Sequence, residues 1–300
     1  MSIASIPCML REEARTRKPN EPCLSRFIDL ELTDLKSLGL WRGAMAEFIG
    51  CLFLNMFTIK FGMVAGVTHL QVALGCGFFF AVIITALSTV SGGHVNPAVS
   101  IGFLVTGHIT VVRFIVYTVF QTCGGLTGVA LLKVVIPESM HGNLGIIKIG
   151  KECTLGMAVG SEIYVTFFLM FVVMAMIDSG RKDVQGSIPF MVGLTVTINI
   201  FYGETLSGGI MNPVRNFAPA LIKGDLENIW VYWVGPMIGG VIGSLTYDLV
   251  FATSPGTLWR KYRRGAIQDY EHPKGEEAEG KVYKKMLTKK KDYNSHESNI

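Results

Sequence analysis

Two motifs in this chain combine an amide side chain with a proline, and they are Asn96-Pro97-Ala98 and Asn212-Pro213-Val214. Asparagine suits the N-cap of a helix, and proline suits its first position, where no N–H is needed. Each motif therefore predicts a helix start, and aligned peptide dipoles give such an end roughly half a positive charge. An asparagine amide there can donate to a passing neutral oxygen, whereas a cation would meet an opposing field.

Each motif opens an apolar segment that is too short to cross a bilayer, about Pro97–Thr106 and about Pro213–Ile222. A crossing helix needs about 20 residues. A Ser-Gly-Gly triplet stands before each motif, beginning at Ser91 and at Ser207. Non-helical backbone at membrane depth is tolerated where it lines a water-filled cavity or is buried in protein. The pattern predicts two half-helices that enter the membrane and meet at a pore.

Long apolar stretches must position these half-helices. Six are long enough to span, approximately Trp41–Phe61, Leu70–Val90, Phe114–Ile136, Leu155–Ile177, Ile188–Leu206 and Ile229–Phe251. Charged residues make up only 17% of the chain, against roughly 25% in soluble domains, and they gather in the tails. A soluble helical protein fits these runs poorly, and the basic carboxyl-terminal tail indicates positive-inside bias rather than nucleic-acid binding.

The two halves of the chain repeat one another. Asn96 and Asn212 lie 116 positions apart, and two carboxylates inside spans, Glu47 and Glu162, lie 115 apart. Each half holds three spans, an odd number, so the second half enters the membrane inverted. Inverted repeats with broken helices at mid-membrane mark a transport pathway.

These motifs resemble the two pore loops of the aquaporin, or major intrinsic protein, family. The resemblance rests on Ser91–Val99, Ser207–Ala220 and Tyr232–Pro236, and it covers roughly Gly39 to Phe251. It implies an all-α membrane protein with six transmembrane helices and two re-entrant half-helices, assembled as a homotetramer with one pore per subunit. It also implies a passive channel. No enzyme activity, cofactor or metal is expected, because the sequence contains no nucleophile–base or metal-binding constellation. The chain departs from the family pattern at Val214, where alanine is usual.

Four positions match the family's selectivity filter by their spacing to the motifs: Cys76, Ile200, Gly209 and Arg215. A buried arginine with fixed donors binds a permeant oxygen and repels cations. In strict water channels of the family, an aromatic residue and a histidine stand where this chain has Cys76 and Ile200. The wider, more apolar opening predicts that glycerol, urea or similar uncharged solutes pass with water.

The residues that distinguish subfamilies resemble different branches of the family. The filter resembles that of insect glycerol channels, the entomoglyceroporins, whereas Tyr232-Trp233 resembles the water-channel branch and Asn216 replaces the aspartate of older glycerol facilitators. A register slip would bring an aromatic ring of Phe78–Phe80 into the filter. A strict water channel, an active transporter and a weak-pore junctional or scaffold protein are the alternatives.

Three polar residues have two interpretations each. Glu47 and Glu162 would relay protons in an active transporter, or they would brace the pore loops by hydrogen bonds. Their equivalent placement favours bracing. His94 in the first loop would line the cytoplasmic vestibule or act as a pH sensor, or it would be satisfied by backbone carbonyls.

The same observations predict the organisation of the whole chain. We expect a cytoplasmic tail over residues 1–38, a channel domain over 39–252 with halves at about 39–137 and 155–252, and a basic cytoplasmic tail over 253–300. Both termini are expected in the cytoplasm, and the plasma membrane is the expected location. The expected partners are water, small neutral solutes and membrane lipid.

Overall fold

The computed structural model describes residues 23–183 and 186–256. They belong to the first of two compact units, Met1–Gly265. The amino-terminal residues 1–22 and most of the predicted basic tail, residues 257–300, lie outside the described residues.

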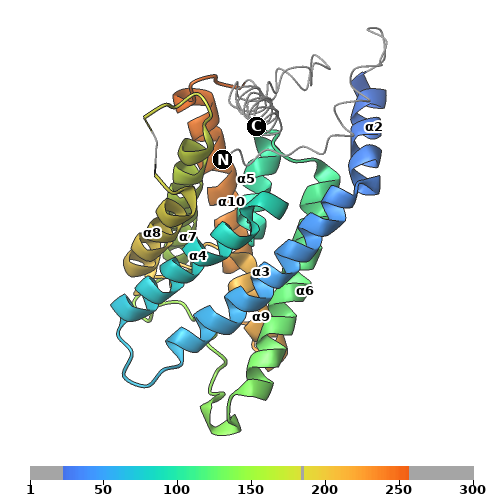
Figure 1. The fold of residues 1–300 in the computed structure, drawn as a ribbon. Helices are drawn as coiled ribbons and strands as arrows, with labels where there is room; N and C mark the ends of the chain where they lie inside the picture. Colours follow the sequence, from blue (N-terminus) through green and yellow to red (C-terminus); the bar gives the residue numbers. More distant parts are fainter. Residues whose placement is uncertain (1–22, 184–185, 257–300) are drawn as a thin grey trace, which may run out of the picture. The chain divides into compact units, whose positions relative to one another are not determined.

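Six longer helices and two short ones form the described bundle (Figure 1). The longer helices are α3 (Leu38–Gly62), α4 (His69–Ser91), α6 (Val111–Val135), α7 (Leu155–Ile177), α8 (Ile188–Gly203) and α10 (Val231–Thr246). The short helices are α5 (Pro97–Val105) and α9 (Pro213–Lys223). A 3-10 turn, η1 (Glu138–Met140), follows α6, and a π-helical turn, η2 (Tyr247–Phe251), extends α10. The predicted architecture of six helices and two half-helices is confirmed.

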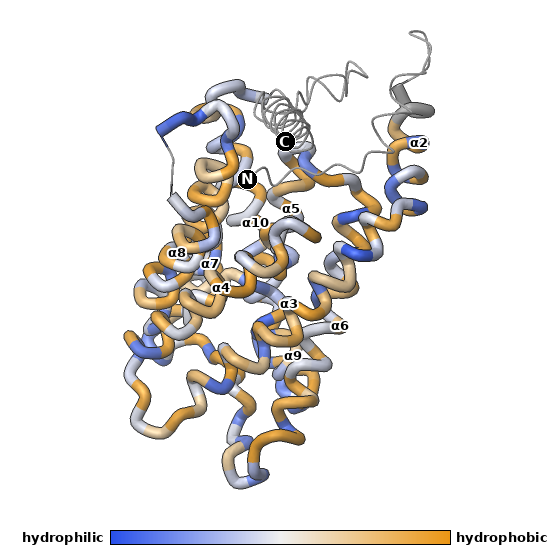
Figure 2. Tube along the Cα trace, viewed as in Figure 1, coloured by the Kyte–Doolittle hydropathy of each residue, from blue (hydrophilic) through white to orange (hydrophobic). Residues whose placement is uncertain are grey.

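Five of these helical segments are long and apolar enough to cross a membrane, α10 being counted together with η2. Figure 2 shows hydrophobic residues along the bundle and hydrophilic ones in the connection that follows α7. The sixth, α8, has 16 residues and ends three residues earlier than predicted. The chain turns at Gly203, whose carbonyl accepts from the N–H groups of Leu206, Ser207 and Gly208. A side chain at Gly203 would lie 2.7 Å from Cα of Gly209, so the helix ends where the second pore loop packs.

Helix packing repeats between the halves. Helix α3 packs on α6, and α7 packs on α10 in the same way. A Cβ at Gly124 of α6 would lie 2.1 Å from the carbonyl oxygen of Phe48, and a Cβ at Gly239 of α10 would lie 2.4 Å from that of Ile163. Both glycines and both carbonyls are 115 positions apart. Glycine therefore allows close helix approach at equivalent places, which supports the predicted duplication.

Helices α4 and α8 cross at a second pair of equivalent glycines. A Cβ at Gly77 would lie 2.5 Å from the carbonyl oxygen of Gly193, and a Cβ at Gly193 would lie 2.3 Å from that of Gly77. Each residue of the pair meets its own counterpart from the other half. The inverted halves therefore meet along these two helices, with their backbones almost in contact.

A helix that the sequence did not suggest, α2 (Cys23–Lys36), precedes the bundle. The carboxylate of Glu31 accepts from the N–H groups of Val111 and Val112, at 3.0 and 2.7 Å, and so caps the start of α6. The carboxylate of Asp34, with 1% of its side chain exposed, forms a 2.5 Å ion pair with Arg113 of α6. Acidic side chains stabilise a helix N-terminus. The carboxylates of Glu31 and Asp34 therefore hold α2 against the start of α6.

Replacing Arg113 with methionine is expected to lower the free energy of unfolding by about 3–5 kcal/mol, because the Asp34 carboxylate would stay buried without a cation. The same change at Arg181, whose ion pair with Asp183 is largely exposed, is the matched control and should cost at most about 1 kcal/mol. Thermal unfolding of the detergent-solubilised protein measures both. Equal losses in the two variants would contradict the buried pair.

The end of α7 is tied to the end of the last helix through Asp178. Its carboxylate accepts from the hydroxyl and N–H of Thr253, at 2.6 and 2.9 Å, from the N–H of Gly180 at 3.0 Å and from the Tyr247 hydroxyl at 3.1 Å. Burial alone would raise the pKa of Asp178, but these hydrogen bonds outweigh it and hold the pKa below its usual value. The carboxylate is therefore charged at neutral pH, and it closes this end of the bundle.

Candidate pore site

Both Asn-Pro motifs begin helices as predicted. Asn96 is the N-cap of α5, and its side-chain oxygen accepts from the N–H of Ala98 at 2.8 Å. Asn212 is the N-cap of α9, and its side-chain oxygen accepts from the N–H of Val214 at 3.1 Å. Proline occupies the first turn of each helix. The side-chain oxygen of each asparagine thus accepts a hydrogen bond from its own helix, and the NH₂ group of the same amide points away from that helix.

The NH₂ groups of the two asparagines tie the pore loops to each other. Nδ2 of Asn96 donates to the carbonyl oxygen of Met211 at 2.8 Å, and Nδ2 of Asn212 donates to that of Val95 at 2.9 Å. An amide NH₂ group has two hydrogens, so each asparagine keeps one donor for a permeant oxygen. The two motifs, 116 positions apart, therefore form one site.

The residues that accept these bonds have unusual backbone conformations. Val95 has φ 43° and Met211 has φ 55°, a left-handed region that costs a residue with Cβ roughly 1–2 kcal/mol. Each stands directly before its asparagine. The strain is maintained by the contacts around each loop, and it turns both carbonyls toward the opposite motif.

Glu47 of α3 binds the first pore loop. Its carboxylate accepts from the hydroxyl of Ser91 at 2.6 Å and from the N–H groups of His94 and Val95 at 2.9 and 2.5 Å. The amide of Gln121 in α6 adds a fourth donor at 2.7 Å. Glu47 is 0% exposed, so this carboxylate satisfies loop donors that have no water nearby.

Glu162 of α7 does the same for the second loop. Its carboxylate accepts from the hydroxyl of Ser207 at 2.6 Å and from the N–H groups of Ile210 and Met211 at 2.9 and 2.8 Å. Pro236 stands at the position equivalent to Gln121 and has no amide to offer. The second carboxylate therefore has the same backbone partners without the glutamine.

Val214 fits the second motif because a glycine faces it. Val214 is fully buried, and a Cβ at Gly125 of α6 would lie 2.4 Å from its Cγ1. In the other half, a Cβ at Gly240 would lie 2.4 Å from the carbonyl oxygen of Ala98. The larger side chain thus occupies space left by Gly125, and the start of α9 matches that of α5.

The structure places two predicted filter residues, Ile200 and Gly209, in close contact. Ile200 packs against the apolar cluster that contains Cys76. A Cβ at Gly209, which has φ +60°, would lie 3.0 Å from Cα of Ile200. Phe78, which a register slip would have placed in the filter, is 59% exposed, whereas Cys76 is 4% exposed. This exposure argues against Phe78, whereas Phe79 and Phe80 pack against the same apolar cluster as Cys76.

Arg215 lies in the first turn of α9. One of its guanidinium nitrogens, Nη1, donates to the carbonyl oxygen of Gly145 at 2.7 Å. Its guanidinium also lies near the thiol of Cys76. A guanidinium has five N–H donors, so donors remain for a permeant oxygen. Gly145 belongs to the connection between α6 and α7, which the sequence did not link to the filter.

His94 is packed rather than open. It is 4% exposed, and its Nδ1 lies 3.0 Å from the hydroxyl of Ser100. Its ring lies against Phe103, with centroids 4.4 Å apart, and edge-on to Tyr117 at 5.5 Å. Its partner is a hydroxyl rather than the backbone carbonyls considered from the sequence, and its burial favours a structural role over vestibule lining.

Tyr117 is a loop contact that the sequence reasoning missed. Its hydroxyl accepts from Nη1 of Arg113 at 3.0 Å and donates to the carbonyl oxygen of Ser91 at 3.1 Å. Through Arg113 it links α2 to the first pore loop. The sequence did contain a signal for Tyr117, because Tyr232 stands at the equivalent position of the second half, 115 positions later. A repeated tyrosine does not by itself indicate a contact with a pore loop.

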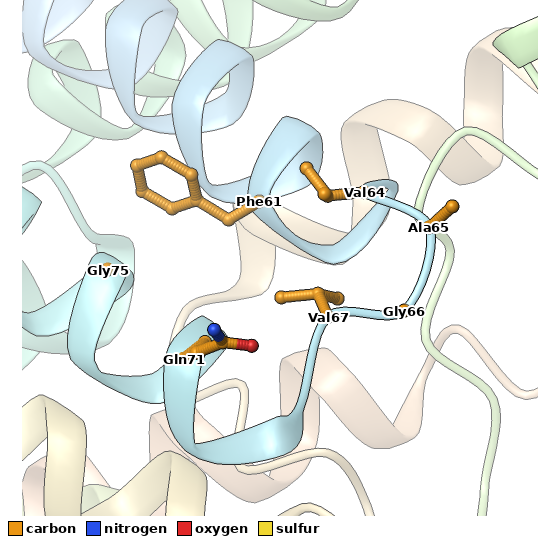
Figure 3. A pocket seen from close by; sticks show the side chains of 7 residues that line it. All are labelled: Phe61, Val64, Ala65, Gly66, Val67, Gln71 and Gly75. Carbon is orange, nitrogen blue, oxygen red and sulfur yellow. The ribbon is translucent and has the colours of Figure 1, made fainter.

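A pocket of about 410 Å³ lies at the turn between α3 and α4, and Figure 3 shows the side chains that line it. Residues between Phe61 and Gly75 line it, and none of them belongs to the predicted site. The side-chain oxygen of Gln71 accepts from the N–H of Thr68 at 2.9 Å, which closes the start of α4. This pocket therefore belongs to a helix turn and not to the pore motifs. Among the described residues, no cluster of His, Cys, Asp or Glu could hold a metal ion.

Comparisons with known proteins agree with this geometry. A model of the family described as major intrinsic protein matches residues 34–247. The lens fiber major intrinsic protein of Oryctolagus cuniculus is 38% identical over 224 residues, which cover 72% of this chain and 84% of that protein. The human protein of the same name is 36% identical over 220 residues, with the same coverage. An X-ray structure of the aquaglyceroporin from Plasmodium falciparum has a similar fold, with a TM-score of 0.64 and 22% identity over 70% of this chain and 96% of that chain.

Proposed function

The chain belongs to the major intrinsic protein family, whose members are membrane channels rather than enzymes, and from this membership we propose that it passes water, glycerol, urea and similar uncharged solutes. It excludes protons and ions. The observation that carries the proposal is the pair of crossed amides: Asn96 and Asn212 each bond the backbone of the opposite loop and each keep one donor free.

Exclusion of cations follows from the two helix ends. The N-termini of α5 and α9 come together where Asn96 and Asn212 bond to the opposite loops. Each end carries roughly half a positive charge, so the two together oppose a cation, hydronium included. Water and alcohol hydroxyls are neutral and can accept from the free amide hydrogens. The six motif residues from Asn96 to Ala98 and from Asn212 to Val214 form this central site.

The solute range is set at the filter of Cys76, Ile200, Gly209 and Arg215. The arginine gives a fixed cation and donors on one side, and Ile200 with its apolar neighbours gives a surface without hydrogen-bonding groups on another. Glycerol has hydroxyls for the first side and a carbon backbone for the second. This division supports passage of small polyols with water.

Glu47 and Glu162 act as braces, and His94 fills the space behind the first loop. Both carboxylates already accept from several loop donors, and their equivalent positions argue against a one-way proton relay. An active transporter would need coupling groups of its own at the midplane.

The surroundings of the channel complete the proposal. The channel domain covers residues 39–252, with a tail of residues 1–38 that contains α2 and a basic tail over residues 253–300. Both tails lie in the cytoplasm, so the connection between α6 and α7 is extracellular. The protein is a homotetramer in the plasma membrane, with lipid against its exposed apolar side chains.

Proteoliposomes test this function directly. The purified full-length protein should speed shrinkage in a sucrose gradient, and in a glycerol or urea gradient shrinkage should be followed by reswelling as the solute enters. Water flux without solute entry would indicate a strict water channel, and no flux of either kind would indicate the scaffold alternative. Rapid collapse of an imposed pH gradient would contradict proton exclusion.

A further inference from the structure

The connection between α6 and α7, residues 136–154, lies against the second pore loop. The N–H of Gly150 donates to the carbonyl oxygen of Leu206 at 2.8 Å, and a Cβ at Gly150 would lie 2.1 Å from the carbonyl oxygen of Thr205. The carbonyl oxygen of Gly145, in the same connection, accepts from Arg215 at 2.7 Å. Residues far from the motifs in sequence therefore contact both the loop and the filter arginine.

The carbonyl of Gly145 is presented by a tight turn. Leu144 has φ 55° and Gly145 has φ 65°, and the side chain of Asn143 accepts from the N–H of Gly145 at 3.1 Å and donates to the carbonyl oxygen of Ile146 at 3.0 Å. A Cβ at Gly145 would lie 2.9 Å from Cγ2 of Ile59. Leu144 also packs in the apolar cluster that contains Ala218 of α9, but apolar packing alone does not fix the direction of the Gly145 carbonyl.

Asn216 adds a directional, hydrogen-bonded connection between this segment and α9. Its side-chain oxygen accepts from the N–H of Ile147 at 2.9 Å, and its Nδ2 donates to the carbonyl oxygen of the same residue at 3.0 Å. Asn216 is 1% exposed, so both bonds form where water does not compete. The amide pairs with the backbone of Ile147 as a neighbouring strand would. It is adjacent to Arg215 in sequence, and Ile147 is two residues from Gly145.

We propose that Asn216 is a positioning residue of the selectivity filter: by holding Ile147 it places the carbonyl of Gly145, which orients the guanidinium of Arg215. The turn around Gly145 thereby becomes a further wall of the filter. This inference rests on the proposed function and adds to it the residue that fixes the arginine.

The chemistry of the site explains why an amide is needed. Only a side chain with one acceptor and one donor on the same carbon can satisfy both the N–H and the C=O of Ile147. Aspartate has the same shape but no donor at neutral pH, so one of its oxygens would face the carbonyl oxygen of Ile147. Serine has a single hydroxyl on a shorter side chain and cannot make both bonds. Either change should release the Gly145 turn and let Arg215 swing.

The test compares glycerol and water permeability of Asn216→Asp and Asn216→Ser in proteoliposomes. We expect the glycerol-to-water ratio to rise about fivefold in both, the size of losing one net hydrogen bond, because a loosened arginine and turn widen the opening. Asn228→Asp, a change of equal charge in the connection between α9 and α10, should leave the ratio unchanged. Retained water flux shows that each variant is folded.

A double-mutant cycle separates positioning from a general structural effect. In an Arg215→Val background, Asn216→Ser should change the ratio less than twofold, since the residue acts through the arginine. An equal change in both backgrounds, or no change in Asn216→Ser with the arginine present, would overturn the proposal. If the wild-type protein passes no glycerol but Asn216→Ser does, the proposed solute range is wrong, whereas the positioning role of Asn216 is supported.

Discussion

A channel that carries Cys76→Phe together with Ile200→His is expected to lose glycerol permeability at least about fivefold while its water permeability stays within about threefold of wild type. Both side chains lie in or against the apolar cluster beside Arg215. A phenyl ring and an imidazole narrow the opening there. Forcing atoms into a filled space costs about 1–3 kcal/mol, or roughly 5- to 150-fold in rate. Water is smaller, and it gains a hydrogen-bond partner from the imidazole.

Stopped-flow light scattering of proteoliposomes measures both permeabilities. Val82→Phe with Tyr202→His is the matched control, because it adds the same side chains to the same helices at positions 68% and 52% exposed. That control should keep the wild-type ratio. If the phenyl ring at position 76 reduces the yield of folded protein, the same permeabilities are measured for the single variant Ile200→His, which is a smaller change. An unchanged glycerol-to-water ratio in folded double variant would show that Cys76 and Ile200 do not form the constriction.

Replacing Glu47 with leucine is expected to abolish folding of the channel. The change leaves four donors without their acceptor, from Ser91, His94, Val95 and Gln121. Each unsatisfied buried donor costs about 1–3 kcal/mol, so the sum is roughly 4–12 kcal/mol. That is comparable with the whole stability of a typical protein, about 5–15 kcal/mol. Size-exclusion chromatography in detergent should show aggregate instead of a defined oligomer.

Two comparisons make this result specific. Glu47→Gln keeps the shape and one carbonyl oxygen, so it should fold with a lowered midpoint of thermal unfolding. Glu138→Leu makes the same loss of charge in the exposed turn η1 and should behave as wild type. A monodisperse, water-conducting Glu47→Leu protein would contradict the bracing role.

Much of the architecture was predictable because its signals are local. The half-helix starts at Asn96 and Asn212 follow from capping chemistry, and the spans follow from runs of apolar residues. The repeat at 115 to 116 positions gave the inversion, and it reappears in the glycine contacts of α6 and α10. The departure at Val214 was visible in the sequence, but only the packing identified Gly125 as the residue that makes room for it.

Where the prediction was incomplete, long-range contacts made the difference. Helix α8 ends at Gly203 because the pore loop packs there, and α2 is held by Arg113, 79 positions after Asp34. The amphipathic character of α2 is not visible as an apolar run, so a search for membrane spans passes over it. The loop position of His94 left two interpretations open, and only the structure shows that its ring packs against the rings of Phe103 and Tyr117.

By itself the sequence determined the family, the inverted duplication and the residue types at the centre of the pore, because capping, apolar length and repeat spacing are properties of neighbouring residues. Only the tertiary structure decided how those residues meet. The crossed bonds of Asn96 and Asn212 join atoms 115 and 117 positions apart, and the pair of bonds between Asn216 and Ile147 spans 69. Such pairings depend on the packing of the whole bundle, which fixes the distances that no local pattern specifies.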